Sequence, residues 1–321
     1  MITEGILNIN KPQNMTSHDV VSAVRRTLGI RKVGHTGTLD PMATGVLPVC
    51  IGRSTRIMEY LDMDMKRYRC RMVLGIETDT QDIWGQVTGR KPAAVSEEEI
   101  RRAFGAFDGV IDQKPPMYSA LKVNGKRLYE YAREGKTVEV KTRKVFLRNM
   151  EIEEISAGGD GLPQIAFSVE CTKGTYIRTI CQDVGLALDT YGTMTFLERT
   201  ASGSFDLGSA VALEQLSAMD EEEIRHSMIP TWGPLGAFGK VVCGEEDGLR
   251  FATGWHLPLE ACSIERRPLY EDTPFVLPMR EDFRRAYCVF GMIGGRETFL
   301  GVACYSQQYG KLVADKVFFV R

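Results

Sequence analysis

The spacing of apolar residues at the start of the chain predicts a strand followed directly by a helix. Residues 5–9 form a short apolar run that Asn10, Lys11 and Pro12 end, as is typical of a strand. The next apolar side chains are spaced as on one face of a helix: Val20, Val21, Val24 and Leu28. We expect Ser17 to cap this helix, Asp19 to lie in its first turn and Gly29 to end it. This order indicates an α/β or α+β layout.

Strand patterns recur through the middle of the chain. Val46–Ile51 is a continuous apolar run that we expect to end in a core. From Tyr68 to Leu74 the side chains alternate, with Arg69 and Arg71 on the opposite side from the apolar ones, so this strand has one buried face. Residues 144–155 and 164–171 are also predicted strands.

Helical patterns lie between these strands. Ser96 and Glu99 form a capping box ahead of apolar residues at helical spacing. Thr175 is expected to cap a helix whose core face holds Ile177, Ile180, Cys181, Val184 and Leu188. Further helices are predicted at residues 55–63, 127–134 and 213–228, the last an acidic helix that closes the first domain.

The last third of the chain predicts a separate domain. Residues 230–236 contain two prolines and two glycines and have the composition of a linker. Beyond them, residues 299–305 and 312–320 alternate as strands do. We therefore divide the chain into residues 1–234 and a small β-rich domain at 235–321.

Charge is distributed unevenly, although the net charge is only −2. Ten lysines and arginines between residues 114 and 148 accompany three glutamates, whereas residues 205–282 hold fifteen acidic and six basic residues. A basic lobe on an acidic chain fits a surface that faces phosphates, and a solvated charged hairpin is the alternative interpretation.

The composition argues against several classes of protein. None of the eight cysteines form a Cys-x-x-Cys pair and the four histidines are dispersed, so no metal site is predicted. The chain lacks a phosphate-binding Gly-x-x-x-x-Gly-Lys-Ser/Thr motif and the His-x-Glu motif of zinc base deaminases. It has no signal-peptide pattern and no apolar run as long as a membrane span, so we expect a cytoplasmic protein that does not contact a membrane.

Candidate chemistry begins in residues 34–48, which hold three glycines, two prolines and one carboxylate, Asp40, followed by Pro41. On spacing alone, an Asp beside a Pro is typical of a turn. However, the whole segment 31–48 closely resembles the catalytic motif of the bacterial tRNA pseudouridine synthase B family. That resemblance implies that Asp40 is the essential residue of uridine isomerisation.

Three more segments resemble motifs of the same family. The resemblance of residues 5–17 covers the Lys11-Pro12 and Thr16-Ser17 pairs, with Asn14 where the family usually has glycine. The Tyr68-to-Gly75 frame implies that Tyr68 stacks on the target base, although a core-edge aromatic is the alternative. Lys173–Arg178 implies that Arg178 pairs with Asp40 in a bidentate manner, although an arginine on a helix is otherwise usually solvated.

Residues 113–141 resemble the RNA-binding thumb insertion of this family. Pro115 and Pro116 require an extended entry, Asn124-Gly125 is a tight-turn signal, and tyrosines are interleaved with basic residues. The resemblance implies that His35 fills the space left by the extruded base. It assigns the following residues to RNA binding: His35, Lys11, Lys114, Pro115, Tyr118, Lys122, Lys126, Arg127 and Leu197.

Residues 191–205 depart from the family pattern. Thr193 and Met194 stand where Ala-His is common, and Glu198 replaces the first of two arginines, whereas Leu197 and Arg199 remain. The departures put one RNA contact in doubt and leave the catalytic set intact.

The resemblance implies an α+β pseudouridine-synthase fold, with a mixed central sheet flanked by helices, the thumb insertion and a C-terminal PUA-like RNA-binding domain. It implies isomerisation of uridine 55 in the T loop of tRNA. Separately from the resemblance, we expect a monomer. The isomerisation involves no redox change or net group transfer, so no cofactor or metal is required. A tRNA-binding protein that remodels the T arm without chemistry is the alternative function, and the trio Asp40, Tyr68 and Arg178 favours the enzyme.

Overall fold

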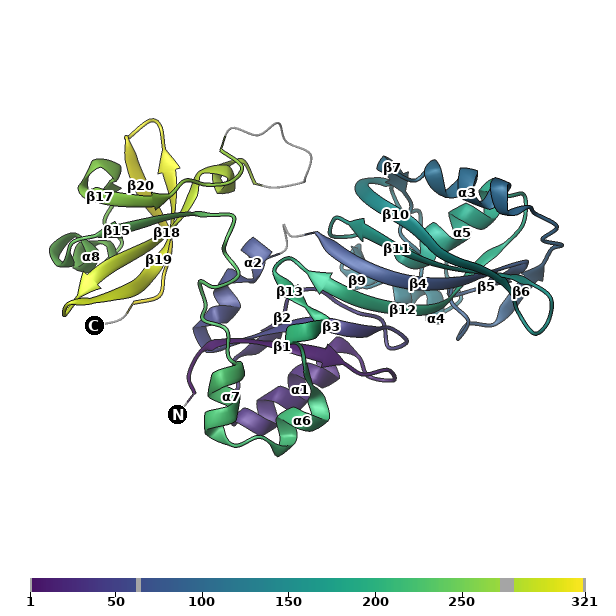
Figure 1. Cartoon of the computed structure of the whole chain (residues 1–321), viewed down its shortest axis with the longest axis horizontal. Helices are drawn as coiled ribbons and strands as arrows, with labels where there is room; N and C mark the ends of the chain where they lie inside the picture. The colour runs from purple at the N-terminus through teal and green to yellow at the C-terminus, as the bar shows by residue number, and fades with distance from the viewer. Residues whose placement is uncertain (1, 62–64, 272–279, 320–321) are drawn as a thin grey trace.

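The computed structural model describes residues 2–61, 65–271 and 280–319, and two large sheets dominate it (Figure 1). The strands of the larger sheet are β1 (Gly5–Lys11), β2 (Val33–His35), β3 (Thr44–Ile51), β4 (Lys66–Leu74), β7 (Gly109–Gln113), β10 (Arg143–Ala157), β11 (Pro163–Cys171), β12 (Gly192–Ser202), β13 (Phe205–Asp206) and β14 (Val211–Ala212).

The larger sheet is mixed, and β12 joins its two halves. The order is β14–β1–β3–β12–β4–β11–β10–β7, with β2 beside β3 and β13 beside β12. β12 runs parallel to β3 only through Glu198 and Arg199, but antiparallel to β4 over nearly its whole length. The chain segments before β3, along β4 and along β12 therefore meet at one junction, where the sheet changes from one half to the other.

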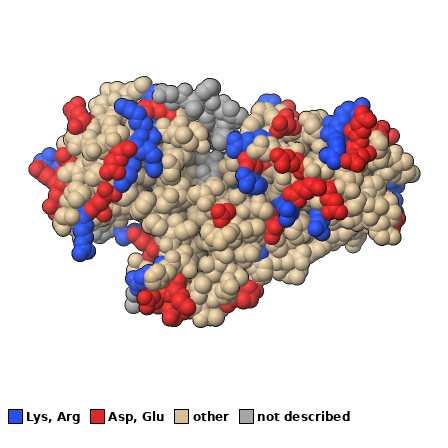
Figure 2. Space-filling model, in the orientation of Figure 1, with Lys and Arg blue, Asp and Glu red and all other residues tan. Residues whose placement is uncertain are grey.

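Helices cover each half separately (Figure 1). α1 (Ser17–Leu28), α6 (Leu213–Ala218) and α7 (Glu221–Ser227) pack on the β1–β3 half, and α3 (Glu97–Gly105) and α5 (Ile177–Ala187) pack on the β4–β11–β10 half. The alternation predicted for Tyr68–Leu74 is confirmed, because Arg69 and Arg71 are exposed and the apolar side chains lie under α5. Figure 2 shows acidic side chains gathered on the β1–β3 half, where α7 begins with three glutamates.

The thumb insertion is a small hairpin and helix between β7 and β10. Its strands β8 (Lys122–Val123) and β9 (Lys126–Arg127) are joined through Asn124 and Gly125, both with positive φ, as the tight-turn signal predicted. α4 (Leu128–Arg133) follows and ends before Gly135. A second hairpin, β5 (Ile76–Thr78) and β6 (Val87–Arg90), extends from the end of β4.

The C-terminal sheet confirms the predicted β-rich region. Its order is β16–β20–β19–β18–β15–β17. The elements are β15 (Gly239–Cys243), α8 (Glu245–Phe251), β16 (Leu257–Pro258), β17 (Cys262–Arg266), β18 (Ala286–Ile293), β19 (Arg296–Ser306) and β20 (Lys311–Val317), with short 3₁₀ turns η3 (Leu259–Ala261) and η4 (Glu281–Arg285). Val320, placed in the last predicted strand, lies outside the described residues.

A shared apolar cluster joins this sheet to the first. It combines Ile57 and Tyr60 with Phe238, Phe283 and Phe318, among others. Polar contacts border the cluster, including a 2.6 Å hydrogen bond between the Ser54 and Thr231 hydroxyls. The 230–236 segment that resembles a linker is therefore partly buried, because it packs between the two sheets.

Several predicted helix limits are wrong, each for a local reason. Thr16, not Ser17, caps α1, because its hydroxyl forms the capping box with Asp19. Tyr176, not Thr175, precedes α5. The 213–228 helix is two helices, because Asp220 caps a new one. Residues 52–61 form a 3₁₀ turn, η1 (Gly52–Ile57), and a short helix, α2 (Met58–Leu61). Met63 lies outside the described residues. A 3₁₀ turn, η2 (Leu207–Ser209), completes the elements.

In the described part of the chain, no helix has the length and apolarity needed to cross a bilayer.

Candidate active site

Asp40 lies on a loop between β2 and β3 that α1 holds in place. The Ser17 hydroxyl accepts a 2.8 Å hydrogen bond from the Leu39 amide and donates a 3.2 Å bond to the Leu39 carbonyl. The Asn14 amide, in a left-handed residue, donates to the Pro41 carbonyl at 2.9 Å. Ser17 thus fixes the residue next to Asp40, which explains why Thr16 takes the capping role. The Asp40 side chain stays 36% exposed and open to a substrate.

Arg178 reaches Asp40 from the first turn of α5. Its Nε lies 2.9 Å from Asp40 Oδ2, and its side chain is only 5% exposed, so the solvated-arginine alternative is wrong. The bidentate pairing is also wrong. The other two guanidinium nitrogens donate to the carbonyls of Thr80 at 2.7 Å and Tyr118 at 2.8 Å. The Nε contact lacks hydrogen-bond alignment, so the attraction between Arg178 and Asp40 is mainly Coulombic.

The N-terminus of α5 is anchored by the start of the thumb. Buried Gln113 accepts a 2.7 Å hydrogen bond from the Tyr176 amide and donates a 3.1 Å bond to the Tyr176 carbonyl. These bonds satisfy backbone groups that no capping side chain reaches. The position of Arg178 is therefore linked to the base of the thumb at both Gln113 and Tyr118.

Asp82 is a functional candidate that the sequence interpretation missed. Its Oδ2 lies 3.6 Å from Arg178 Nη1, so Arg178 sits between two carboxylates. Burial raises the pKa of Asp82, while Arg178 and the hydroxyl of Thr80 act in the opposite direction. The signal that could have found it is the polar run Thr78–Asp82 directly after a buried strand, since such a loop often carries binding residues.

Tyr68 lies on β4 directly opposite Arg199 of β12, on the buried face of the sheet. Burial raises the pKa of the Tyr68 hydroxyl, which Arg199 partly offsets, so the group is a neutral phenol at neutral pH. Arg199 is fully buried and donates to the carbonyls of Val46 at 2.6 Å and Gly37 at 3.2 Å. It therefore ties both ends of the Asp40 loop to β12. This role was also missed.

Gly45 shows how closely the loop and β12 approach each other. Its φ is +103°, and a Cβ placed there would lie 2.2 Å from the backbone oxygen of Arg199.

Leu197, assigned to RNA binding, is buried in the cluster that contains Tyr68. Two departures from the family pattern have structural roles: the Thr193 hydroxyl donates to the Ile76 carbonyl at 2.7 Å, and Met194 is in the core.

Lys11 and His35 border the loop. Lys11 is fully buried and its ammonium donates to the carbonyls of Pro12 at 2.8 Å and Met15 at 2.6 Å. Burial lowers the pKa of Lys11 to about 8, against the opposing effect of Asp40. It makes its contacts with the protein backbone. Burial also lowers the pKa of His35, whose Nδ1 accepts from the Gly37 amide at 3.3 Å, so its imidazole is neutral at pH 7.

The structure separates the predicted RNA-binding residues of the thumb into two groups. Pro115 is buried and Tyr118 half-buried at the thumb base, beside exposed Lys114, and the Tyr118 hydroxyl donates to Asp79 at 3.4 Å. Lys122 and Arg127 are exposed on the hairpin, where Arg127 lies over the Tyr129 ring at 5.8 Å. Lys126 pairs with Glu134 and lies 4.9 Å from the Tyr131 ring centre.

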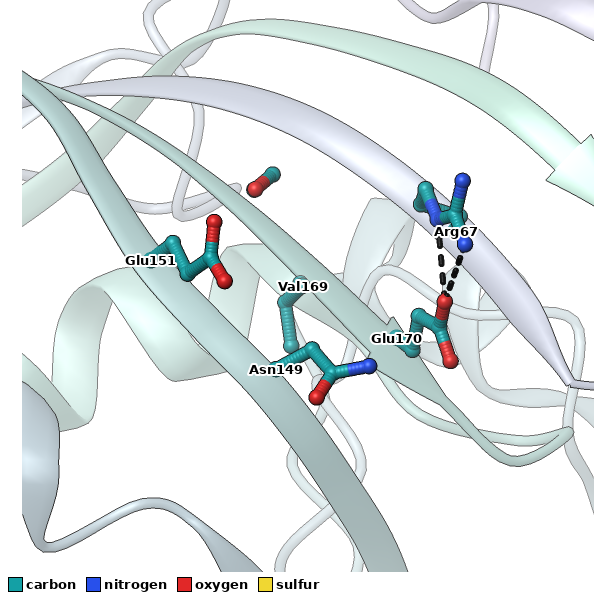
Figure 3. A pocket seen from close by; sticks show the side chains of 6 residues that line it. Arg67, Asn149, Glu151, Val169 and Glu170 are labelled. Atoms are coloured by element: carbon teal, nitrogen blue, oxygen red, sulfur yellow. Dashed lines mark hydrogen bonds and ion pairs between the residues drawn. The ribbon is translucent and has the colours of Figure 1, made fainter.

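A hollow of about 370 Å³ lies on the outer face of the sheet, the face that carries exposed Arg67 and lies opposite buried Tyr68 (Figure 3). It is lined by Arg67, Asn149, Glu151, Ser168, Val169 and Glu170. Glu170 pairs with both Arg67 and Arg148, and acidic and basic side chains are interspersed over this face (Figure 2). Across the described ranges, no group of three His, Cys, Asp or Glu side chains could hold a metal ion.

Comparisons with known proteins agree with this geometry. A model described as the N-terminal domain of TruB family pseudouridylate synthases matches residues 25–177, and one described as the C-terminal domain of tRNA pseudouridylate synthase B matches residues 178–232. The chain is 48% identical to tRNA pseudouridine synthase B of Alkaliphilus oremlandii, covering 74% of this chain and 77% of that protein. The chain is 46% identical to tRNA pseudouridine synthase B of Clostridium kluyveri, covering 76% of this chain and 81% of that protein.

Solved structures show the same fold. A Cbf5–Nop10–Gar1 complex matches with a TM-score of 0.71 and 25% identity, covering 98% of this chain and 84% of that one. The archaeal box H/ACA sRNP Nop10–Cbf5 complex matches with a TM-score of 0.69 and 24% identity, covering 98% of this chain and 85% of that one. These matches extend through the C-terminal sheet.

Proposed function

The chain belongs to the TruB family of pseudouridylate synthases, and from this premise we propose that it converts uridine 55 in the T loop of tRNA to pseudouridine. It is an isomerase, and the observation that carries the proposal is the Asp40–Arg178 ion pair at the junction of the sheet. A reactive carboxylate that stays open to solvent while its cation is buried suits attack on a sugar. Release of tritium from C5-labelled uridine in unmodified tRNA tests the activity.

The reaction exchanges an N-glycosidic bond for a C-glycosidic bond. The N1–C1′ bond breaks, the uracil rotates and a C5–C1′ bond forms. The C5 proton leaves to solvent and N1 takes up a proton. Asp40 acts either as the nucleophile at C1′ or as the base at the 2′ carbon. Arg178 holds Asp40 in position. Cationic Lys11 stabilises the negative charge of Asp40.

Tyr68 and His35, near Asp40, act when the target base is extruded from the RNA. The target uracil leaves its stack, which costs a few kcal/mol, and Tyr68 stacks on it. Neutral His35 fills the vacated space, because an uncharged imidazole is the form that enters a base stack most easily. Tyr68 helps to remove the C5 proton, which ends in solvent, where the tritium is counted.

Lys11 gives the activity a pH dependence. The pKa of Lys11 is lowered to about 8, so its charge is present below pH 8 and lost above it. We expect kcat/KM for tRNA to fall about tenfold, equivalent to about 1.4 kcal/mol, as the pH rises through 8. The Lys11→Met variant, measured from pH 6.5 to 9.5, should be slow throughout and lack this step. Identical pH profiles for the two proteins would contradict the role.

The thumb should supply salt-dependent affinity. Replacing Lys122, Lys126 and Arg127 by alanine should weaken tRNA binding and reduce the slope of log K against log salt by about 2 to 3, since each phosphate contact contributes about 0.9. Lys144→Ala is the matched control, because Lys144 is an exposed cation on β10 outside the hairpin. Filter binding at several salt concentrations measures both. Unchanged affinity of the triple variant at every ionic strength would remove the thumb from the RNA interface.

The remaining assignments extend the same proposal. We place the division between domains near residue 234, with residues 235–321 as a PUA-like RNA-binding domain. That domain exposes Trp255 and Tyr309, with Arg250 5.3 Å and Lys311 5.7 Å from the Trp255 ring centre, which suits RNA contact. The enzyme works as a cytoplasmic monomer on the T stem-loop. Remodelling of the T arm without chemistry is the second function, which the same basic thumb favours.

A further inference from the structure

The hairpin loop of residues 79–86, between β5 and β6, contacts Arg178 through the Thr80 carbonyl and exposes two large apolar side chains. Trp84 is 50% exposed and Ile83 is 42% exposed. Within residues 2–61, 65–271 and 280–319, no ring stacking or cation–π contact involves Trp84. We propose that Trp84 is a stacking platform for an unpaired base of the RNA that flanks the target uridine. The inference rests on the proposed function, since it deepens the RNA recognition of the same site.

The loop is held in one conformation by its own hydrogen bonds. The Asp82 carboxylate accepts from the Trp84 amide at 3.1 Å and from the Thr80 hydroxyl at 2.9 Å. The Asp82 carbonyl accepts from the Thr78 hydroxyl at 2.7 Å, and Asp79 accepts from the Gln86 amide at 2.8 Å. The loop therefore presents the indole on a fixed support, so little conformational entropy is lost when a base stacks on it.

Contacts with three neighbours fix the loop within the active site. The Ile83 amide donates to the Met194 carbonyl of β12 at 2.8 Å. The Thr80 carbonyl accepts a hydrogen bond from Arg178 of α5, and the Asp79 carboxylate accepts one from the Tyr118 hydroxyl at the thumb base. Trp84 is four residues from Thr80, so their Cα atoms are at most about 14 Å apart. The loop that carries Trp84 thus contacts both the helix of Arg178, which pairs with Asp40, and the base of the thumb.

The chemistry of the loop favours a nucleobase as the occupant. An indole offers a broad π-face that any base can stack on, and an aromatic ring beside a basic thumb is the combination that single-stranded nucleic acid binds. A base extruded next to the target also loses its own stacking partner, and Trp84 replaces it. Ile83 extends the apolar surface beneath that base.

The test makes Trp84 the reporter, because the chain has only three tryptophans. A Trp232→Phe, Trp255→Phe protein retains Trp84 alone, and its emission is followed during titration with a T stem-loop RNA. A blunt duplex with the same stem and no loop is the control. We expect saturable quenching of Trp84 by the stem-loop and little quenching by the duplex. Emission unchanged at saturating stem-loop, with binding confirmed by filter assay, would overturn the inference.

Substitution of Trp84 in the otherwise native chain measures its contribution. Trp84→Leu should weaken stem-loop binding about 5- to 150-fold, the range for loss of one base-stacking contact, and Trp84→Phe should restore most of it. Both variants should fold, since the side chain is exposed. Equal affinity of Trp84→Leu and wild type would contradict the platform. Quenching of Trp84 without tritium release would contradict the proposed isomerase activity and support the platform. Tritium release without quenching would support the isomerase activity and contradict the platform.

Discussion

Replacing Asp40 by asparagine should abolish isomerisation while tRNA still binds. Asparagine has nearly the same shape as aspartate but can neither attack C1′ nor remove a 2′ proton, so turnover should fall about 10⁴-fold or more. The side chain is partly exposed and Arg178 keeps its two carbonyl acceptors, so stability should change by no more than about 1 kcal/mol. Single-turnover tritium release and filter binding measure the two effects separately.

The control for this variant is Asp189→Asn, since Asp189 is an exposed carboxylate outside the site that pairs only with Lys91 in the described structure. It should retain wild-type turnover. If Asp40→Asn turned over at the wild-type rate, the chemistry would lie elsewhere in the chain. If Asp40→Asn lost tRNA binding as well as turnover, Asp40 would shape the loop and its chemical role would be unsupported.

Replacing Arg178 by lysine should have the second-largest effect, although the charge is retained. Lysine is a point charge, so it cannot contact Asp40 and the carbonyls of Thr80 and Tyr118 together. We expect kcat to fall about 10²- to 10³-fold, as for loss of one positioned donor, with tRNA affinity little changed. Pre-steady-state tritium release gives kcat independently of binding.

A neutral substitution separates the structural role of Arg178 from its catalytic one. Arg178→Met leaves the buried carboxyl of Asp82 without its cation, and breaking such a pair should lower the free energy of unfolding by about 3 kcal/mol. Urea unfolding measures this loss. Arg148→Lys, on the outer face of the sheet, is the matched control and should leave both readouts unchanged. Wild-type kcat in Arg178→Lys would contradict the positioning role.

Features set by local sequence could be predicted. The alternation from Tyr68 to Leu74, the capping box of Ser96 and Glu99, and the Asn124-Gly125 turn each depend on residues within one element, and each is confirmed. The corrected start of α1 has both a local and a distant cause. Adjacent hydroxyl residues compete for one cap, and at Thr16-Ser17 the first takes it because the second bonds Leu39, a residue far along the chain.

The site itself depends on contacts between distant segments. Spacing alone gave Arg178 a solvated position, because nothing on α5 reveals that Asp40, Thr80 and Tyr118 surround its guanidinium. Asp82 and Arg199 were missed for the same reason: their partners are more than 90 residues away. The resemblance to a family identified the reacting residues, and the structure shows what holds them.

The most direct test of the central claim is the yield of tritium per tRNA. Wild-type enzyme is incubated to completion with an unmodified tRNA transcript labelled at C5 of every uridine, and with the same transcript in which uridine 55 is replaced by cytidine. Site-specific isomerisation predicts release equal to one uridine per molecule from the first transcript and none from the second. Equal release from both would contradict action at position 55, and no release from either would contradict the isomerase itself.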